Sequence, residues 1–159
     1  MNLTKTLTEI LSEELVKEKL SDLILAATIY GEAGGEGEQG MKAVANVIKN
    51  RADSKGISPK DVVLKPKQFS MWNNKQDKKS QINYIKNINS QASKNPNVKS
   101  VWDKAKSLVS THINSKGDDV TKGAEYYHTI SIKPYWTKNL EYTTTIGKHK
   151  FYKPLIKSS

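Results

Sequence analysis

The sequence predicts an α+β domain, in which helices fill roughly the first three quarters of the chain and a small antiparallel sheet ends it. Before Gly117 the apolar residues recur at helical spacing, whereas the residues after Gly123 alternate and are rich in aromatic and β-branched side chains. The 159 residues suffice for one ordinary domain with its own core. We therefore expect a single domain with one active site.

The first element is expected to be an amphipathic helix over residues 1–20. Its apolar residues recur at three- and four-residue spacing: Leu3, Leu7, Ile10 and Leu11. Ser21 has the side chain of an N-cap, so a second helix is expected from there to about Tyr30. We expect the first helix to pack on a domain that spans residues 21–153.

A glycine-rich segment comes next. Residues 31–40 contain five glycines, too many for a stable helix interior, so the second helix should end or bend close to Glu32. Glu36 and Glu38 then stand at the start of a third helix, where carboxylates interact favourably with the helix dipole. This helix should end near Arg51. Its buried face consists of Met41, Val44, Ala45 and Ile48.

A short helix and a loop are expected after it. Ser58 and Pro59 are residues favoured at the N-cap and the first position of a helix. Residues 69–79 are mostly polar and show no apolar periodicity, which is typical of a loop.

Two longer helices should complete the helical part. The first is predicted by isoleucines at three-residue spacing around Ile85. The second should begin at the Asn-Pro pair at Asn95 and end before Gly117. Trp102 and His112 lie in the apolar stripe of that last helix and are expected in the core. The segments AEYYHT, LEYTTTI and KFYK then predict two or three antiparallel strands, the last two joined by a turn at Gly147.

The charge of the chain favours a polyanionic partner. Lys and Arg number 26 against 16 Asp and Glu, which gives a formal charge of +10. Nucleic acid, anionic lipid head groups and acidic polymers of a bacterial envelope all fit such a charge, and so does solubility alone.

Cysteine is absent, which excludes disulfides, thiolate catalysis and cysteine-based zinc sites. We also find no export signal in the first twenty residues and no apolar run long enough for a membrane span. We therefore expect a protein made in the cytoplasm that does not insert stably into membranes.

Glu32 is the candidate catalytic residue. Cleavage of a glycosidic bond needs a carboxylic acid that is still protonated near neutral pH. Glu32 follows an apolar helix, where partial burial would raise its pKa, and the glycines after it let a bulky polymer approach the backbone. Taken alone, a glutamate beside glycines is more often a cap or a solvated loop residue.

The run YGEAGGEGEQGMKAVANVIKNR, residues 30–51, is a more specific signal. It resembles the signature of the cell wall hydrolases related to the spore-cortex-lytic enzymes of endospore formers, in which a Glu-Ala pair and a Gly-Glu pair precede a helix that ends in Asn-Arg. The segment KPKQFSMW and residues 123–152 are similar to later segments of that family, so the resemblance covers roughly residues 20–152. It implies a mostly helical domain like lysozyme or a lytic transglycosylase, which cuts between N-acetylmuramic acid and N-acetylglucosamine with Glu32 as catalytic acid.

The matching segments also contain side chains that suit a sugar polymer, because aromatic rings stack on sugars while amides and hydroxyls bind their polar groups. The binding candidates are Gln68, Phe69, Ser70, Trp72, Tyr127, His128 and Trp136. Phe69 could equally be a core residue, and His128 could contact substrate, position Glu32 or be structural. We expect neither a metal ion nor another cofactor.

The number of catalytic carboxylates decides the reaction. An ordinary glycosidase uses two, whereas a lytic transglycosylase can use one, because the C6 hydroxyl of the substrate attacks and a 1,6-anhydro sugar forms. Beyond the glycine-rich segment no other acidic residue follows an apolar helix as Glu32 does. This favours the transglycosylase, and a hydrolytic muramidase or glucosaminidase remains the alternative.

Compared with the best-known members of that family, the sequence lacks their peptidoglycan-binding domain and export signal. We therefore expect a monomeric phage lysis enzyme, an endolysin, that binds peptidoglycan glycan strands and possibly anionic envelope polymers. Three other hypotheses stay open: a basic nucleic-acid-binding module, an inactive structural virion protein, and a zinc amidase, although the three histidines lack ligand-like spacing.

Overall fold

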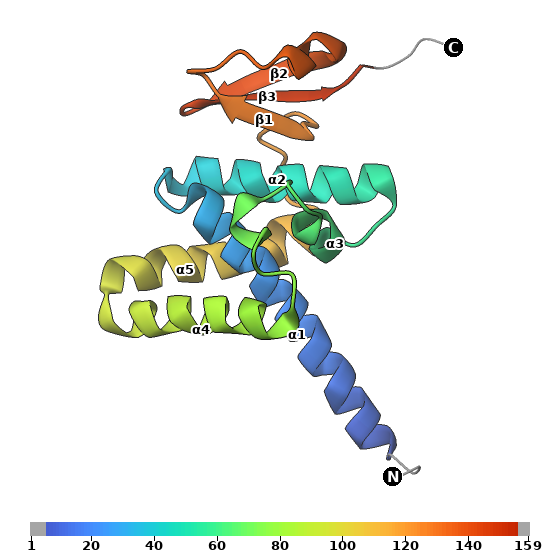
Figure 1. The fold of residues 1–159 in the computed structure, drawn as a ribbon, viewed down its shortest axis with the longest axis vertical. Helices are drawn as coiled ribbons and strands as arrows, with labels where there is room; N and C mark the ends of the chain where they lie inside the picture. Colours follow the sequence, from blue (N-terminus) through green and yellow to red (C-terminus); the bar gives the residue numbers. More distant parts are fainter. Residues whose placement is uncertain (1–5, 156–159) are drawn as a thin grey trace.

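The computed structural model describes residues 6–155 as helices followed by a small sheet (Figure 1), which confirms the expected α+β class. The α-helices are α1 (Leu7–Ala33), α2 (Gly37–Lys55), α3 (Pro59–Leu64), α4 (Lys78–Lys94) and α5 (Pro96–Leu108). Shorter helical turns are η1 (Ser70–Trp72), η2 (Val109–Ile113) and η3 (Tyr135–Asn139). The strands are β1 (Tyr126–Thr129), β2 (Leu140–Ile146) and β3 (His149–Pro154).

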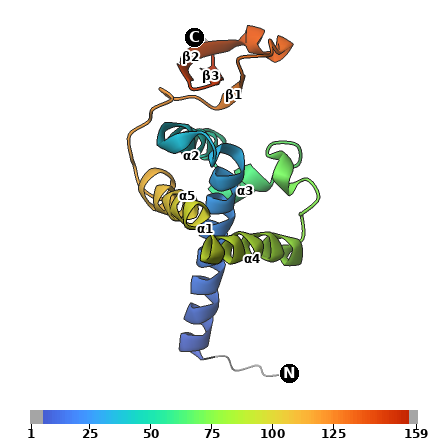
Figure 2. The same cartoon turned by 90° about the vertical axis from the view of Figure 1, so that its left-hand side faces the viewer.

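Helix α1 is one continuous helix, so the expected division at Ser21 is wrong. No glycine or proline interrupts the chain there, and the N-cap preference of Ser21 is too weak to break a helix whose next turn is buried. Figures 1 and 2 show the first half of α1 extending away from the other helices. Leu3 lies outside the described residues, and the packing of residues 1–20 on the domain stays a prediction.

The other helix boundaries follow local capping chemistry. The Ser58 side chain accepts a hydrogen bond from the backbone N–H of Asp61, and the Asn95 side chain accepts from the backbone of α5, as expected of N-caps. Helix α2 continues four residues past Arg51, to Lys55, and ends at Gly56, whose φ of 64° is left-handed. The expected loop over residues 69–79 contains the turn η1 and the start of α4.

The sheet is antiparallel with strand order β1-β3-β2, and Gly147 forms the turn between β2 and β3 with a φ of 56°. Figures 1 and 2 show the sheet lying over α2, on the side opposite α4. A large core joins the helices and includes the buried Trp102, and a smaller cluster of Ala43, Val47, Ala124 and Phe151 joins α2 to the sheet. No helix in the described part of the chain is long and apolar enough to cross a membrane.

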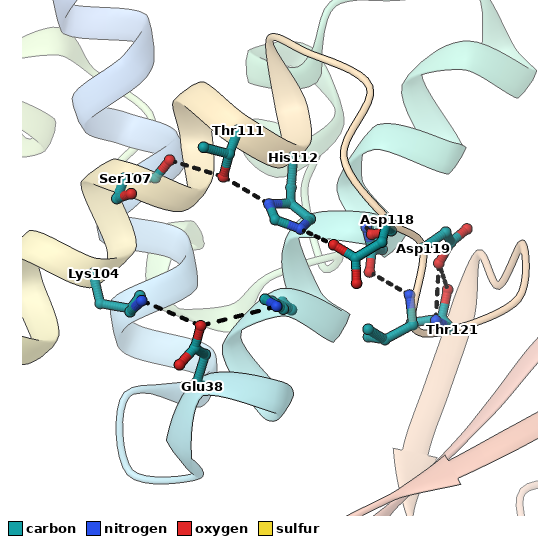
Figure 3. Close-up of polar contacts among 11 residues, drawn as sticks. Glu38, Lys104, Ser107, Thr111, His112, Asp118, Asp119 and Thr121 are labelled. Carbon is teal, nitrogen blue, oxygen red and sulfur yellow. Dashed lines mark hydrogen bonds and ion pairs between the residues drawn. The ribbon is translucent and has the colours of Figure 1, made fainter.

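The segment that leads from η2 to β1 is tied to its surroundings by polar contacts, several of which Figure 3 shows. His112, buried as expected, has its Nε2 atom 2.8 Å from the Asp118 carboxylate. From α2, the Asn46 amide donates to the carbonyl oxygen of Asp118 at 3.1 Å, and the Asn50 amide donates to that of Ala124 at 2.9 Å. These contacts fix where β1 begins relative to α2.

Candidate active site

Glu32 lies in the last turn of α1, as the glycine-rich segment after it predicts. Its neighbours Ile29 and Ala33 are buried in the core, so its half-buried side chain starts from a rigid part of the helix. The hydroxyl of Tyr127, from β1, donates a hydrogen bond to Glu32 Oε2 at 3.0 Å. The fold thus joins two candidate residues that are 95 positions apart in the sequence.

Burial raises the pKa of the Glu32 carboxyl above its ordinary value, because partial desolvation disfavours the charged form. The hydrogen bond from Tyr127 opposes this rise, and so do the electrostatic interactions of Glu32 with His149 and Arg51. The negative charge of Glu36 adds to the rise. Glu32 therefore has the environment of a carboxylic acid that keeps its proton to higher pH than a solvated one.

Ring contacts with two side chains of strand β3 hold Tyr127 in place. The centroid of the Tyr127 ring lies 5.5 Å from those of both Phe151 and His149 on the neighbouring strand β3. Burial and the nearby Glu32 carboxylate raise the pKa of the Tyr127 phenol well above its ordinary value. Tyr127 therefore keeps its proton to higher pH than a solvated phenol and can donate to Glu32.

Glu36 takes part in the same cluster. Its side chain makes no cap for α2 and instead places Oε2 3.2 Å from His149 Nδ1. A Cβ atom at residue 40 would lie 2.8 Å from Glu36 Cβ, so Gly40 leaves the room for this contact. Besides its expected favourable interaction with the dipole of α2, Glu36 thus makes a contact with strand β3 that the sequence did not indicate.

Arg51 supplies a fixed buried cation behind this cluster. Its Nε donates to the carbonyl oxygen of Glu125, and its Nη1 donates to Gln68 Oε1 at 3.3 Å. The guanidinium also lies 5.5 Å from the ring centroid of Phe69 and 5.4 Å from that of Tyr126. Arg51 thereby links α2, the segment before η1, and the start of β1.

Two of the expected binding residues belong to the core. Trp72 is 0 % exposed, and its indole N–H donates to Thr28 Oγ1 at 2.9 Å. Phe69 is 2 % exposed and packs beneath Arg51. Neither ring has a free face for a sugar, so we correct their expected role in binding to one in packing.

His128 and Trp136 lie away from Glu32. Successive residues of a strand point to opposite faces, so His128 faces away from the Tyr127 side of the sheet. Its ring stacks on Tyr152 with a centroid distance of 5.2 Å, and Trp136 meets its edge at 5.7 Å. The idea that His128 positions Glu32 is therefore wrong; His149 is the histidine near it.

Gln68 and Ser70 are exposed, in the segment before η1 and at its start. They are close in sequence to Met71, which packs against Gly31. If residue 31 had a Cβ atom, that atom would lie only 2.4 Å from Met71 Cε. Gly31 thus lets this segment approach the end of α1. Both residues remain candidates for substrate contact.

Tyr84 is a site residue that the sequence alone did not indicate. It lies on α4, and its hydroxyl would be 3.2 Å from a Cβ atom at residue 31. Burial, the nearby Tyr30 and the charge of Glu32 raise the pKa of Tyr84. The only sequence signal would have been an aromatic residue beside the isoleucine stripe of that helix.

Two pockets meet at the glycine-rich segment. One, of about 380 Å³, lies between the C-terminal end of α1 and the N-terminal part of α5. It is lined by Tyr30, Gly31, Gly34, Gly35, Asn97, Val98 and Val101. The other, of about 290 Å³, lies between α2 and the β2–β3 turn and is lined by Gly35, Glu36, Gln39, Gly40, Ile146, Gly147 and Lys148. Gly35 borders both, and a Cβ atom there would meet nothing within 4 Å. The arrangement suits an extended polymer that passes the end of α1.

The described residues show no cluster of three or more histidines and carboxylates that could hold a metal ion. The side chains at the end of α1 offer a carboxylic acid of raised pKa, oriented by a phenol, and the glycines on either side of it line open pockets.

Comparisons with known proteins agree with this arrangement. A search of curated proteins found no match. The chain is similar to a solved structure described as the catalytic domain of the germination-specific lytic transglycosylase SleB from Bacillus anthracis, with 28% identity, a TM-score of 0.61, and coverage of 84% of this chain and 94% of that one. The catalytic domain of the Bacillus cereus SleB protein is 26% identical, with a TM-score of 0.60 and coverage of 85% and 91%. The model of the Cell Wall Hydrolase family matches residues 35–152, most of the chain, and the chain belongs to this family.

Proposed function

We propose that this chain cleaves the glycan strands of peptidoglycan between N-acetylmuramic acid and N-acetylglucosamine, as a lytic transglycosylase. The observation that carries the proposal is the half-buried Glu32 with raised pKa, hydrogen-bonded by Tyr127 beside two open pockets. Family membership and the similarity to SleB catalytic domains support it. Residues 21–153 would act as one catalytic domain.

In the first step Glu32 donates its proton to the bridging oxygen while positive charge develops at C1 of the muramic acid residue. Its raised pKa keeps the proton available to higher pH than in a solvated carboxyl group. The Tyr127 hydroxyl, which donates to Oε2, orients the carboxyl and stabilises the carboxylate that forms.

In the second step the C6 hydroxyl of the same muramic acid attacks C1 and gives its proton to the Glu32 carboxylate. A 1,6-anhydro sugar forms, no water is consumed, and the acid is restored. One carboxylate therefore suffices. In the hydrolytic alternative a second carboxylate would activate water. Glu36 is the candidate for this second carboxylate, because its charge acts on Glu32.

The product identifies the reaction. Mass spectrometry of muropeptides released from purified peptidoglycan should show 1,6-anhydro ends, one water lighter than hydrolysis products. Glu36→Gln should release the same products. Reducing ends from the wild type that disappear in Glu36→Gln would instead establish hydrolysis with Glu36 as the second carboxylate.

The pH profile of Tyr127→Phe tests the hydrogen bond to Glu32. Activity that needs protonated Glu32 is lost as pH rises through its pKa. Because the hydrogen bond lowers this pKa, its loss should move the alkaline limb of kcat/KM to higher pH, and the optimal rate should fall about 10- to 100-fold. Glu36→Gln should move the limb to lower pH, because the Glu36 charge raises the pKa. An unchanged limb in Tyr127→Phe would show that Tyr127 does not act on Glu32.

We further propose that this cleavage serves phage-mediated lysis, with a monomeric enzyme made in the host cytoplasm that reaches the wall after release. The charge of +10 would favour its retention on anionic envelope polymers. Efficient secretion of the native chain through the general export pathway would contradict this setting.

A further inference from the structure

The pocket between α2 and the β2–β3 turn has the size and lining of a sugar-binding subsite. We propose that it binds an N-acetylmuramyl residue that carries its peptide stem, with Gln39 contacting the acetamido group and Lys148 the stem. This inference rests on the proposed function and adds a place on the molecule where a muramyl residue of the strand is held.

A continuous set of contacts joins this pocket to Glu32. Glu36 lines the pocket and contacts His149 at 3.2 Å. The His149 ring packs edge-on against Tyr127, which donates to Glu32. Along this path two side chains, His149 and Tyr127, stand between a sugar in the pocket and the catalytic carboxyl.

The lining offers what an acetamido sugar requires. Ile146 supplies an apolar surface for the acetyl methyl group, and the Gln39 amide can donate to or accept from the acetamido group. Within residues 6–155 the Gln39 side chain makes no hydrogen bond, so its amide is free for a ligand. Gly35 and Gly147 also line the pocket, and a Cβ atom at either position would meet nothing within 4 Å.

Lys148 gives the pocket a cation. No carboxylate among the described residues lies within ion-pair distance of its ammonium group. Glu36, the acidic group of the lining, is engaged by His149. A muramyl residue differs from N-acetylglucosamine in the lactyl group and its peptide stem, whose carboxylates suit this ammonium group.

The first test measures binding to insoluble peptidoglycan in a Glu32→Gln background, so that no cleavage occurs. Adding Gln39→Ala should weaken binding to N-acetylated strands about 3- to 10-fold, and binding to chemically de-N-acetylated strands by less than about twofold. Gln39 is exposed, so the melting temperature should not change. Equal weakening on both substrates, or none on either, would overturn the role of Gln39.

The second test uses stem-bearing glycan strands and the same strands after their stem carboxylates have been converted to amides with carbodiimide and ammonia. Lys148→Ala should weaken binding to the unmodified strands about two- to fivefold at low salt and leave binding to the amidated strands unchanged. Lys55→Ala is the matched control, since it removes the same charge from the exposed end of α2 and should keep the preference. Equal losses in Lys148→Ala and Lys55→Ala would overturn the role of Lys148.

The two proposals fail in different ways. If the wild type releases no muropeptides, the proposed function fails whatever the binding results. If it releases anhydro-muropeptides while Gln39→Ala and Lys148→Ala bind every substrate like their parent, the function stands and the subsite is wrong.

Discussion

Replacing Glu32 by glutamine is expected to lower kcat/KM for peptidoglycan by about 10²- to 10⁴-fold, the range for loss of a general acid. Glutamine has nearly the same shape and can still accept the hydrogen bond from Tyr127, but it has no acidic proton to give to the leaving oxygen. The rate of muropeptide release measures the effect, and the melting temperature checks that the fold is kept.

Glu38→Gln is the matched control for this substitution. Glu38 is exposed in the first turn of α2, where it pairs with Lys104 at 3.2 Å. Its replacement removes the same charge from the same part of the chain and should change the rate less than about twofold, because exposed ion pairs contribute little. Similar rates for Glu32→Gln and wild type would refute Glu32 as the acid.

Trp72→Ala is expected to lower the free energy of unfolding by about 3 to 5 kcal/mol, as when a large buried aromatic side chain is removed. The Trp72 ring has no exposed surface, contacts Tyr84 edge-on at 5.3 Å and donates to Thr28. Its loss would leave a cavity between α1, η1 and α4. Denaturant unfolding measures the change.

Tyr135→Ala provides the comparison, because Tyr135 is 83 % exposed and its removal should change the free energy of unfolding by less than about 0.5 kcal/mol. A small stability loss in Trp72→Ala together with a large loss of peptidoglycan binding would contradict a core role and restore Trp72 as a binding residue.

Local signals in the sequence were enough for most helices. Capping at Ser58 and Asn95 and the glycine at residue 56 act within one helical turn, so the start of α3, the start of α5 and the end of α2 follow from nearby residues. The division of α1 at Ser21 failed because an N-cap residue is also tolerated inside a helix when the flanking apolar residues are buried.

The candidate site was predicted in part. Glu32 and Tyr127 were identified, but His149 was not considered as a neighbour of Glu32 and His128 does not reach Glu32, because alternation along β1 and the pairing of Tyr127 with Phe151 decide which side chains face Glu32. Such pairing is a contact between distant residues, and shifting it by one residue exchanges the two faces.

Arg51 and Tyr84 show a second limit. Arg51 stood in the recognised motif, yet its contacts with Glu125, Gln68 and two aromatic rings exist only after α2 meets the sheet. Tyr84 comes near Glu32 because Gly31 permits a close approach that no local pattern encodes.

The proposed acid and its hydrogen-bond donor come from different parts of the molecule. Glu32 stands on the helical core, whereas Tyr127 comes from the sheet and packs both against that core and against the smaller cluster that joins the sheet to α2. On the proposed function, substitutions at Lys148 in the β2–β3 turn would alter which wall polymers bind while the helical core under Glu32 is kept. The next residue, His149, acts on Glu32 itself, so in the engineering of such enzymes against other cell walls selectivity could be changed at Lys148 but not at His149 without changing the acid.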